Sequence, residues 1–375
     1  MTQLTGFRWA CVCGLWVLLS ACSSAPNKPD PVPLPSVSGE FTVKKVWSNN
    51  LGPITSPLLP SVHGGLVALA SSQGWVAVMD GLTGKDIWRL KLSEGIVAGV
   101  GGDGSRFAVV NQRNEVVTME AGKVLWRYAL SAVSLTPPLV AGGRVFVLGA
   151  DRTVTALDGA SGQKIWTQQR AGDPLVLNQA GLLIPFGDTL LVGWGGRLAS
   201  LNPNNGSVRW ETLLATSRGT NEVERLVDLV AGADRQGSTV CARAFQSSVA
   251  CVDASRGSNL WSRSAQGHTG LAGDDKLIFG AESDSKVHAW QRQGGQIAWS
   301  QEGLRFRGLT APLVLGRSVV LGDENGLLHF LSRQDGKPLL RVVTDGSAIV
   351  GRPVAVDQTL VVVTRAGGVF GYRPE

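Results

Sequence analysis

A tryptophan recurs about every 40 residues along this chain, and this period limits the possible folds more than any other feature. The series is Trp47, Trp88, Trp126, Trp166, Trp210, Trp261 and Trp299. The gaps are 41, 38, 40, 44, 51 and 38 residues, and 41 more lead to Leu340. From Trp88 onward, a glycine precedes each position by four residues: Gly84, Gly122, Gly162, Gly206, Gly257, Gly295 and Gly336. Such a period is typical of repeat architectures.

Each period contains the pattern of four short strands. Between 135 and 167, apolar or alternating runs cover 138–140, 145–148, 154–158 and 164–167, separated by polar and glycine-rich turns. Alternation with period two and turns every eight to twelve residues leave no room for amphipathic helices. Four strands in about 42 residues predict one blade of a β-propeller.

The two ends of the chain predict how the ring closes. Residues 41–48 hold one tryptophan-bearing strand with no blade before it, and 353–373 hold three strands with no fourth. The N-terminal strand therefore completes the last blade, which gives an all-β, eight-bladed propeller without open sheet edges. The expected blades are 52–92, 93–131, 132–171, 172–215, 222–265, 266–303, 304–345, and 346–375 completed by 41–50.

Composition excludes several other classes of protein. With 43% hydrophobic residues and 48 glycines in 375 residues, the chain is too apolar for a disordered protein and has no collagen period. The net charge is +6, but lysine and arginine are scattered without a run of three. A protein dedicated to nucleic acid usually clusters them, so we expect no nucleic-acid partner.

The repeat resembles the quinoprotein (PQQ-type) repeat, whose signature is Ala-x-Asp-x-x-Thr/Ser-Gly-Lys-x-x-Trp. Residues 77–88 (AVMDGLTGKDIW) and 156–166 (ALDGASGQKIW) carry the match. The resemblance implies that each repeat tryptophan packs between neighbouring blades, so we assign these residues no chemical role. Propellers with the Gly-His and Trp-Asp pairs of WD40 repeats fit less well.

We predict that the chain is not an enzyme and needs no cofactor or metal. The resembling dehydrogenases have adjacent cysteines and a calcium site, whereas here the acidic residues mostly occupy turns. The four histidines, His63, His268, His288 and His329, lack zinc-ligand spacing. No glycine-rich motif opens a helix, and no Gly-x-Ser-x-Gly is present. A propeller funnel could still gather ligands from distant blades, so a quinoprotein-like periplasmic oxidoreductase stays as an alternative.

The N-terminus has the pattern of a secretory signal. Arg8 precedes an apolar stretch over 9–19 that is too short to span a bilayer. Residues 19–22 (LSAC) resemble the lipobox of bacterial lipoproteins, which implies cleavage after 21 and lipidation of Cys22. Ser23, in place of aspartate, implies an outer-membrane destination. Prolines at 26, 29, 31, 33 and 35 make 22–40 a semi-rigid tether, followed by the propeller at 41–375.

Two cysteines remain after the signal, Cys241 and Cys251. They lie in successive strand-like runs around a turn at 245–248. An oxidising periplasm permits a disulfide between them. The register is not readable from sequence, and two buried thiols remain an alternative.

The repeat is broken where blade five begins, because the gap from Trp210 to Trp261 is 51 residues. The extra segment, 217–228, mixes charged and apolar residues, which suits either a protein-binding loop or a solvated loop or short helix. A second candidate is 173–178, which enters blade four on the same face; its leucines would otherwise be ordinary inner-strand residues.

With its lipobox, tether, eight blades and Glu-x-x-Arg-Leu-x-Asp element, the chain resembles the assembly-factor lipoproteins of the outer-membrane β-barrel assembly (Bam) complex. The resemblance covers nearly all of 20–375. It implies a scaffold that binds the POTRA domains of the central barrel protein BamA and other assembly components, with unfolded outer-membrane proteins as further partners. Carried over by position, the partner-binding residues are Leu175, Leu177, Asn178, Glu222, Arg225, Leu226 and Asp228.

Two positions depart from the family pattern: Asn178 replaces an arginine, and Val230 replaces an acid. These departures put the charge pairing with the partner in doubt. A ligand- or glycan-binding propeller lipoprotein is the remaining alternative function. The expected location is the periplasmic face of the outer membrane, held by the lipid anchor.

Overall fold

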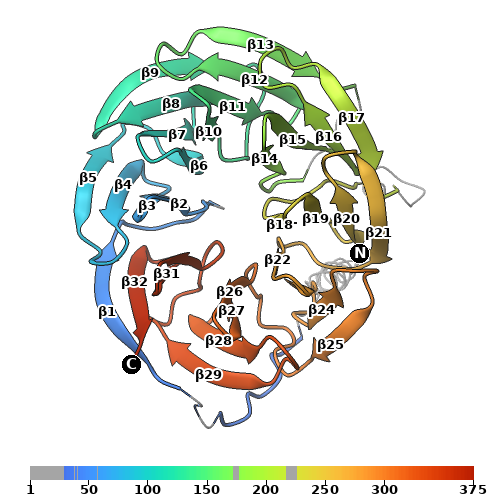
Figure 1. Cartoon of the computed structure of the whole chain (residues 1–375). Coiled ribbons are helices and arrows are strands. Elements are labelled where there is room, and N and C mark those ends of the chain that lie inside the picture. Colours follow the sequence, from blue (N-terminus) through green and yellow to red (C-terminus); the bar gives the residue numbers. More distant parts are fainter. Residues whose placement is uncertain (1–28, 38, 40, 57, 172–176, 217–225) are drawn as a thin grey trace, which may run out of the picture.

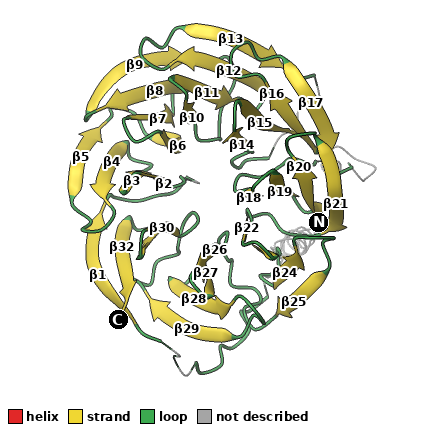
Figure 2. Ribbon diagram, viewed as in Figure 1, coloured by secondary structure: helices red, strands yellow, loops and turns green. Residues whose placement is uncertain are grey.

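Every regular element of the described chain is a β-strand, and the strands form eight four-stranded sheets. The computed structural model describes residues 29–37, 39, 41–56, 58–171, 177–216 and 226–375. Figure 1 shows the sheets as blades around a ring, and Figure 2 shows loops connecting the strands wherever the connection is described. Across these residues, no helix has the length and apolarity needed to cross a membrane.

Blades one to four follow one another along the chain, and in each the first strand is innermost. Blade one contains β2 (Ser61–His63), β3 (Leu66–Ala70), β4 (Trp75–Asp80) and β5 (Asp86–Lys91). Blade two contains β6 (Ile96–Gly102), β7 (Arg106–Asn111), β8 (Glu115–Glu120) and β9 (Lys123–Ala129). Blade three contains β10 (Leu139–Ala141), β11 (Arg144–Leu148), β12 (Thr153–Asp158) and β13 (Lys164–Gln169). Blade four contains β14 (Leu183–Phe186), β15 (Thr189–Trp194), β16 (Arg197–Leu201) and β17 (Val208–Leu213).

The remaining blades complete the ring in the same order. Blade five contains β18 (Asp234–Gln236), β19 (Thr239–Ala244), β20 (Ser248–Asp253) and β21 (Ser258–Ser264). Blade six contains β22 (Ala272–Gly273), β23 (Leu277–Ala281), β24 (Val287–Gln291) and β25 (Ile297–Gln301). Blade seven contains β26 (Leu313–Leu315), β27 (Ser318–Gly322), β28 (Leu327–Ser332) and β29 (Pro338–Val343). Blade eight contains β30 (Val354–Val356), β31 (Thr359–Val363), β32 (Gly368–Pro374) and β1 (Val43–Asn50).

The ring closes through the N-terminal strand, as predicted. β1 is the outermost strand of blade eight and pairs antiparallel with β32, from Val43 opposite Pro374 to Asn50 opposite Gly368. Because this ladder joins the two ends of the propeller, every blade has its full set of four strands. The all-β, eight-bladed prediction is confirmed.

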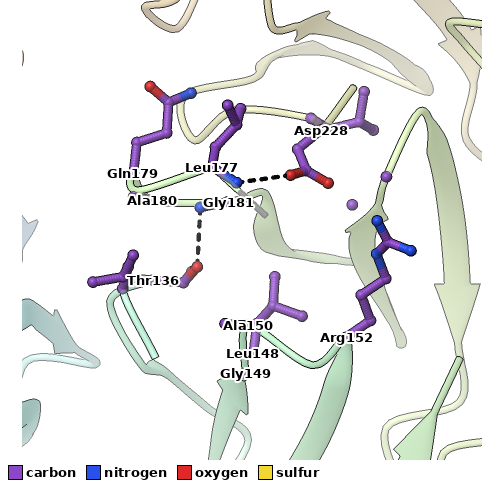
Figure 3. A pocket seen from close by; sticks show the side chains of 14 residues that line it. Thr136, Leu148, Gly149, Ala150, Arg152, Leu177, Gln179, Ala180, Gly181 and Asp228 are labelled. Atoms are coloured by element: carbon purple, nitrogen blue, oxygen red, sulfur yellow. Dashed lines mark hydrogen bonds between the residues drawn. The ribbon is translucent and has the colours of Figure 1, made fainter. Parts of the chain in front are cut away.

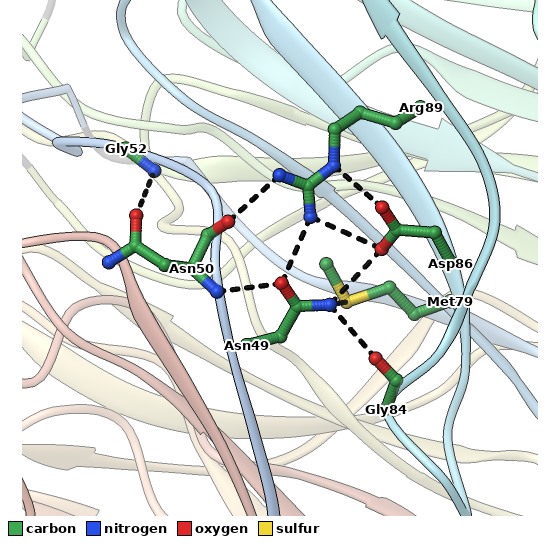
Figure 4. A network of polar contacts seen from close by, with 7 residues as sticks. All are labelled: Asn49, Asn50, Gly52, Met79, Gly84, Asp86 and Arg89. Atoms are coloured by element: carbon green, nitrogen blue, oxygen red, sulfur yellow. Dashed lines mark hydrogen bonds and ion pairs between the residues drawn. The ribbon is translucent and has the colours of Figure 1, made fainter.

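A polar network fastens β1 to blade one at the point of closure (Figure 4). The Asn49 side-chain amide donates to the carbonyl oxygen of Gly84 at 2.9 Å and to Asp86 Oδ1 at 3.1 Å. Arg89 donates to the backbone carbonyl of Asn50 at 2.9 Å and to Asn49 Oδ1 at 3.0 Å. These bonds supplement the β1–β32 ladder where the first and last blades meet.

The repeating tryptophan packs on the repeating glycine of the next blade. At each glycine of the series, φ lies between 69° and 75°, and a Cβ built there would lie 2.3 to 3.2 Å from the tryptophan side chain one repeat earlier. A side chain is therefore excluded by both backbone conformation and contact. Several indoles also donate across the interface; Trp166 Nε1 bonds the carbonyl of Pro203 at 2.9 Å.

The one interface without this pair lies between blades seven and eight. There Leu340 replaces the tryptophan, and Val43 stands four residues before Trp47, where the other blades have glycine. Leu340 and Val43 pack against the same apolar cluster. The two departures from the repeat therefore border one apolar cluster: the leucine is smaller than the usual tryptophan, and the valine is larger than the usual glycine.

The aspartates of the repeat signature organise turns. Asp158 Oδ1 accepts hydrogen bonds from the backbone N–H of Ala160 at 3.1 Å and of Ser161 at 2.8 Å, and from the Ser161 hydroxyl at 2.8 Å. These bonds hold the pKa of Asp158 below its ordinary value. Asp80 is held in the same way by Thr83, chiefly through its hydroxyl. The Asp-x-x-Ser/Thr-Gly motif is therefore explained by turn formation.

The described part of the proline-rich segment lies on the rim of the ring. The Val32 amide donates to the carbonyl of Arg305 at 3.2 Å, and Arg307 donates to the carbonyl of Val32 at 2.7 Å. Arg341 on β29 donates to the carbonyl of Pro35 at 3.1 Å. Leu34 packs against the apolar cluster between blades six and seven. Within the predicted tether, the described residues from 32 onward are therefore attached to the propeller.

Candidate functional site

The candidate site lies where the chain enters blades four and five. Of the predicted partner-binding residues, the structure describes Leu177, Asn178, Leu226 and Asp228. Leu175, Glu222 and Arg225 lie outside the described residues, as does the predicted lipidation site Cys22.

The segment that follows the extra loop is clamped between blades four and five. The Leu229 amide donates to the carbonyl of Gly195 at 3.1 Å, and its carbonyl accepts from Leu182, also at 3.1 Å. On the blade-five side, the Val230 amide donates to the carbonyl of Arg243 at 3.0 Å. Because both neighbours hold the backbone at 229–230, the end of the 217–228 insertion has a fixed position on the ring.

Two of the predicted residues meet in space although 51 positions separate them. The Leu177 amide donates to Asp228 Oδ2 at 3.1 Å (Figure 3). The carboxylate of Asp228 is thus directed toward the segment that enters blade four. Asp228 also accepts a hydrogen bond at its backbone carbonyl from the Phe245 amide at 2.9 Å. This residue therefore links both candidate loops to blade five.

The environment of Asp228 favours its neutral form. Burial raises the pKa of the carboxyl above its ordinary value, whereas the Leu177 amide and the positive charge of Arg152 act in the opposite direction. Arg152 comes from the turn between β11 and β12, where its φ is 63°, and extends from blade three toward Asp228 (Figure 3). Blades three, four and five all contribute to the site.

A small cavity of about 50 Å³ lies beside Asp228. Thr136, Arg152, Leu177, Gln179 and Asp228 contribute to its walls. The Thr136 hydroxyl accepts a hydrogen bond from the Gly181 amide at 2.9 Å, which ties blade three to blade four. Sequence reasoning did not find Arg152, Thr136 or Gln179, because none belongs to a broken repeat.

The other described residues of the site differ in exposure. Asn178 is exposed, and Leu226 is half-buried. Val230, where the family pattern has an acid, is 3% exposed and forms a β-bridge with Gly181. Since an ionised acid is costly to bury without a partner, a valine suits this position in the present chain.

The two cysteines lie in the same blade as the insertion. Cys241 on β19 and Cys251 on β20 are direct cross-strand partners, and the structure joins them by a disulfide. Both are fully buried. The cross-link lies in the sheet to which the 229–230 backbone is bonded.

Nothing in this arrangement has the form of a metal site. In the part of the chain that the structure describes, no three His, Cys, Asp or Glu side chains are grouped so that they could hold a metal ion. His329, which is buried, bonds Asp323 Oδ2 through Nε2 at 2.9 Å.

Comparison with known proteins gives a consistent family. The sequence profile described as outer membrane protein assembly factor BamB matches residues 72–301. Outer membrane protein assembly factor BamB of Burkholderia pseudomallei is 35% identical over 97% of both chains. That of Bordetella pertussis is 32% identical over 98% of this chain and 97% of its own.

Solved structures agree on the fold. BamB from Moraxella catarrhalis covers 88% of this chain and 100% of its own, with a TM-score of 0.80 and 23% identity. Quinohemoprotein alcohol dehydrogenase from Comamonas testosteroni covers 88% of this chain and 76% of its own, with a TM-score of 0.68 and 14% identity. The dehydrogenase shares the propeller alone, whereas the sequence relatives are assembly factors, in agreement with the non-catalytic prediction.

Proposed function

The chain belongs to the BamB family of outer membrane protein assembly factors, and we propose that it is a scaffold lipoprotein of the β-barrel assembly complex. It binds the POTRA domains of BamA through the loops entering blades four and five. In doing so, it holds these domains in an arrangement that aids folding and insertion of outer-membrane β-barrels. Other assembly components and unfolded barrel proteins are its further partners.

One observation supports this assignment most directly, the bond between Leu177 and Asp228. It joins the two segments that the family resemblance marks for partner binding. The clamped backbone at 229–230 gives the insertion a rigid base. A loop on a rigid base loses less conformational entropy on binding than a loop free at both ends, which favours its use as a recognition element.

Lipidated Cys22 anchors the ring to the periplasmic face of the outer membrane. Ten peptide steps lead from Cys22 to Val32, the first described residue that is bonded to the rim. Fully extended, they reach at most about 35 Å. The rim of blades six and seven therefore stays within this distance of the membrane surface, which restricts the faces that the ring can offer to its partners.

The test is recovery of partners from the outer membrane of the native host. Tagged chain is extracted in mild detergent, and its partners are identified by mass spectrometry. We expect BamA with the wild-type chain and a strong loss with Arg225→Glu. Asp228 is a poorer choice because its half-buried carboxylate accepts the bond from Leu177, so its replacement would disturb the loops themselves.

The matched control is Arg256→Glu, which makes the same charge change in blade five. Arg256 lies in the turn between β20 and β21, and its side chain is 82% exposed. Equal recovery of BamA by the wild type and both variants would mean that the insertion is not part of the interface. Absence of BamA from the folded, lipidated wild type would reject the partner assignment.

A further inference from the structure

The centre of the ring holds a channel of about 500 Å³, lined by residues at or just before the inner strands of all eight blades. Its walls are largely apolar, with Leu59, Val100, Ile184 and Val354 among them. Concave sites of this size and character are typical of small-molecule binding.

The channel carries an unbalanced positive charge. Among the described residues that line it, Arg352 is the only arginine or lysine, and there is no aspartate or glutamate. His63 and His268 also line it, and burial and the charge of Arg243 lower the pKa of His268. Arg352 therefore makes the electrostatic potential positive on the blade-eight side of the channel.

Arg352 has no ion-pair partner in the described chain. Among the described acids, Asp234 in blade five is the one whose negative charge raises the pKa of Arg352. That carboxylate is already paired with Arg292. Burial lowers the pKa of Arg352, yet a guanidinium remains charged in proteins. Arg352 is half-buried, and a cation held partly out of water without a counter-ion favours the binding of an anion.

The backbone around Arg352 is fixed. The preceding Val350 amide donates to the carbonyl of Val363 at 2.9 Å. Gly351 has a φ of 69°, and a Cβ there would lie 3.2 Å from Pro60 of blade one. Pro353 follows and restricts φ. The backbone that carries Arg352 is therefore fixed between blades eight and one.

Two uncharged donors in the same wall also lack partners. The Gln179 Nε2 and Thr269 Oγ1 atoms are buried and make no hydrogen bond within the described structure. Buried donors are normally satisfied, so groups of this kind indicate a missing acceptor. They belong to blades four and six, on the other sides of the channel.

We propose that this channel binds a small organic acid, whose carboxylate pairs with Arg352 and whose apolar part contacts the aliphatic wall. A carboxylate suits a lone guanidinium because one negative charge balances one positive charge and two parallel hydrogen bonds form. This site is independent of the proposed BamA contact, although Gln179 and Thr136 line both the channel and the cavity beside Asp228.

The experiment measures binding of butanoate to the full-length lipidated chain in detergent by isothermal titration calorimetry at constant ionic strength. We expect saturable binding by the wild type and affinity about tenfold lower, or worse, for Arg352→Gln and for the uncharged analogue butanamide. The control Arg113→Gln removes an arginine whose side chain is 70% exposed, outside the channel, and should bind as the wild type does.

Circular dichroism first establishes that each variant is folded. If Arg352→Gln does not fold, Arg352→Lys replaces it, and weaker binding is expected because an ammonium cannot form the paired hydrogen bonds. No saturable butanoate binding by the folded wild type, or unchanged affinity in the folded Arg352 variant, overturns the proposal. BamA recovery is measured separately, so failure here leaves the proposed function untouched.

Discussion

The contact between Trp166 and Gly206 allows a quantitative test of how neighbouring blades hold together. Trp166 is 8% exposed and donates from Nε1 to the carbonyl of Pro203 in blade four. Burial of about 150–250 Å² of indole, at about 25 cal/mol per Å², corresponds to roughly 4–6 kcal/mol as an upper limit. Trp166→Ala should therefore lower the free energy of unfolding by about 3–5 kcal/mol.

The reciprocal change, Gly206→Ala, should also destabilise. Its φ is 75°, and the new Cβ would lie 2.6 Å from Trp166 Cε3. The backbone conformation costs an alanine about 1–2 kcal/mol, and the overlap with the indole adds roughly 1–3 kcal/mol. Gly187→Ala is the matched control, because Gly187 has a φ of 57° and nothing near its Cβ position, which isolates the backbone cost.

The decisive measurement is the double-mutant cycle, with urea unfolding followed by far-ultraviolet circular dichroism so that loss of a tryptophan does not alter the signal. In the Trp166→Ala background, Gly206→Ala should cost only the backbone amount, as Gly187→Ala does. The double variant should then be about 1–3 kcal/mol more stable than the sum of the single changes predicts. Strict additivity would refute the contact as the reason why a glycine and a tryptophan recur together in the repeats.

Three further predictions follow from the described contacts. Arg89→Ala should lower the free energy of unfolding by about 1–3 kcal/mol, because the carbonyl of Asn50 and the side chains beside it lose a charged donor. Urea unfolding measures this change, and an unchanged midpoint would contradict the prediction. The folded pKa of Asp228 is raised above 3.8, so its contribution to stability is complete below that pH and is lost as pH rises through the folded pKa. Asp228→Asn should remove this loss of stability, which thermal unfolding over an acid-to-neutral pH series can measure. Parallel curves of melting temperature against pH for the wild type and the variant would contradict a raised pKa. Arg341→Ala should speed hydrogen exchange at the Val32 amide about fivefold, because one of the bonds that hold the rim segment is lost; an unchanged rate would mean that this arginine does not hold it.

The sequence by itself determined the architecture of the ring. The Gly-x-x-x-Trp period sets the number of blades, and the unmatched strand at Val43–Asn50 identifies how the ring closes. Both follow from local, repeated rules: alternation with period two defines each strand, and one glycine and one tryptophan per repeat define each interface. The sequence also located the 217–228 insertion, because it interrupts a regular period.

Only the tertiary structure decided what the loops of the candidate site contact. The bond from Leu177 to Asp228, the approach of Arg152 from blade three and the attachment of Pro35 to blade seven join residues that are distant in sequence. The channel around Arg352 gathers residues from eight blades. No repeat pattern encodes such contacts, because they depend on which side chains the curvature of the closed ring brings face to face.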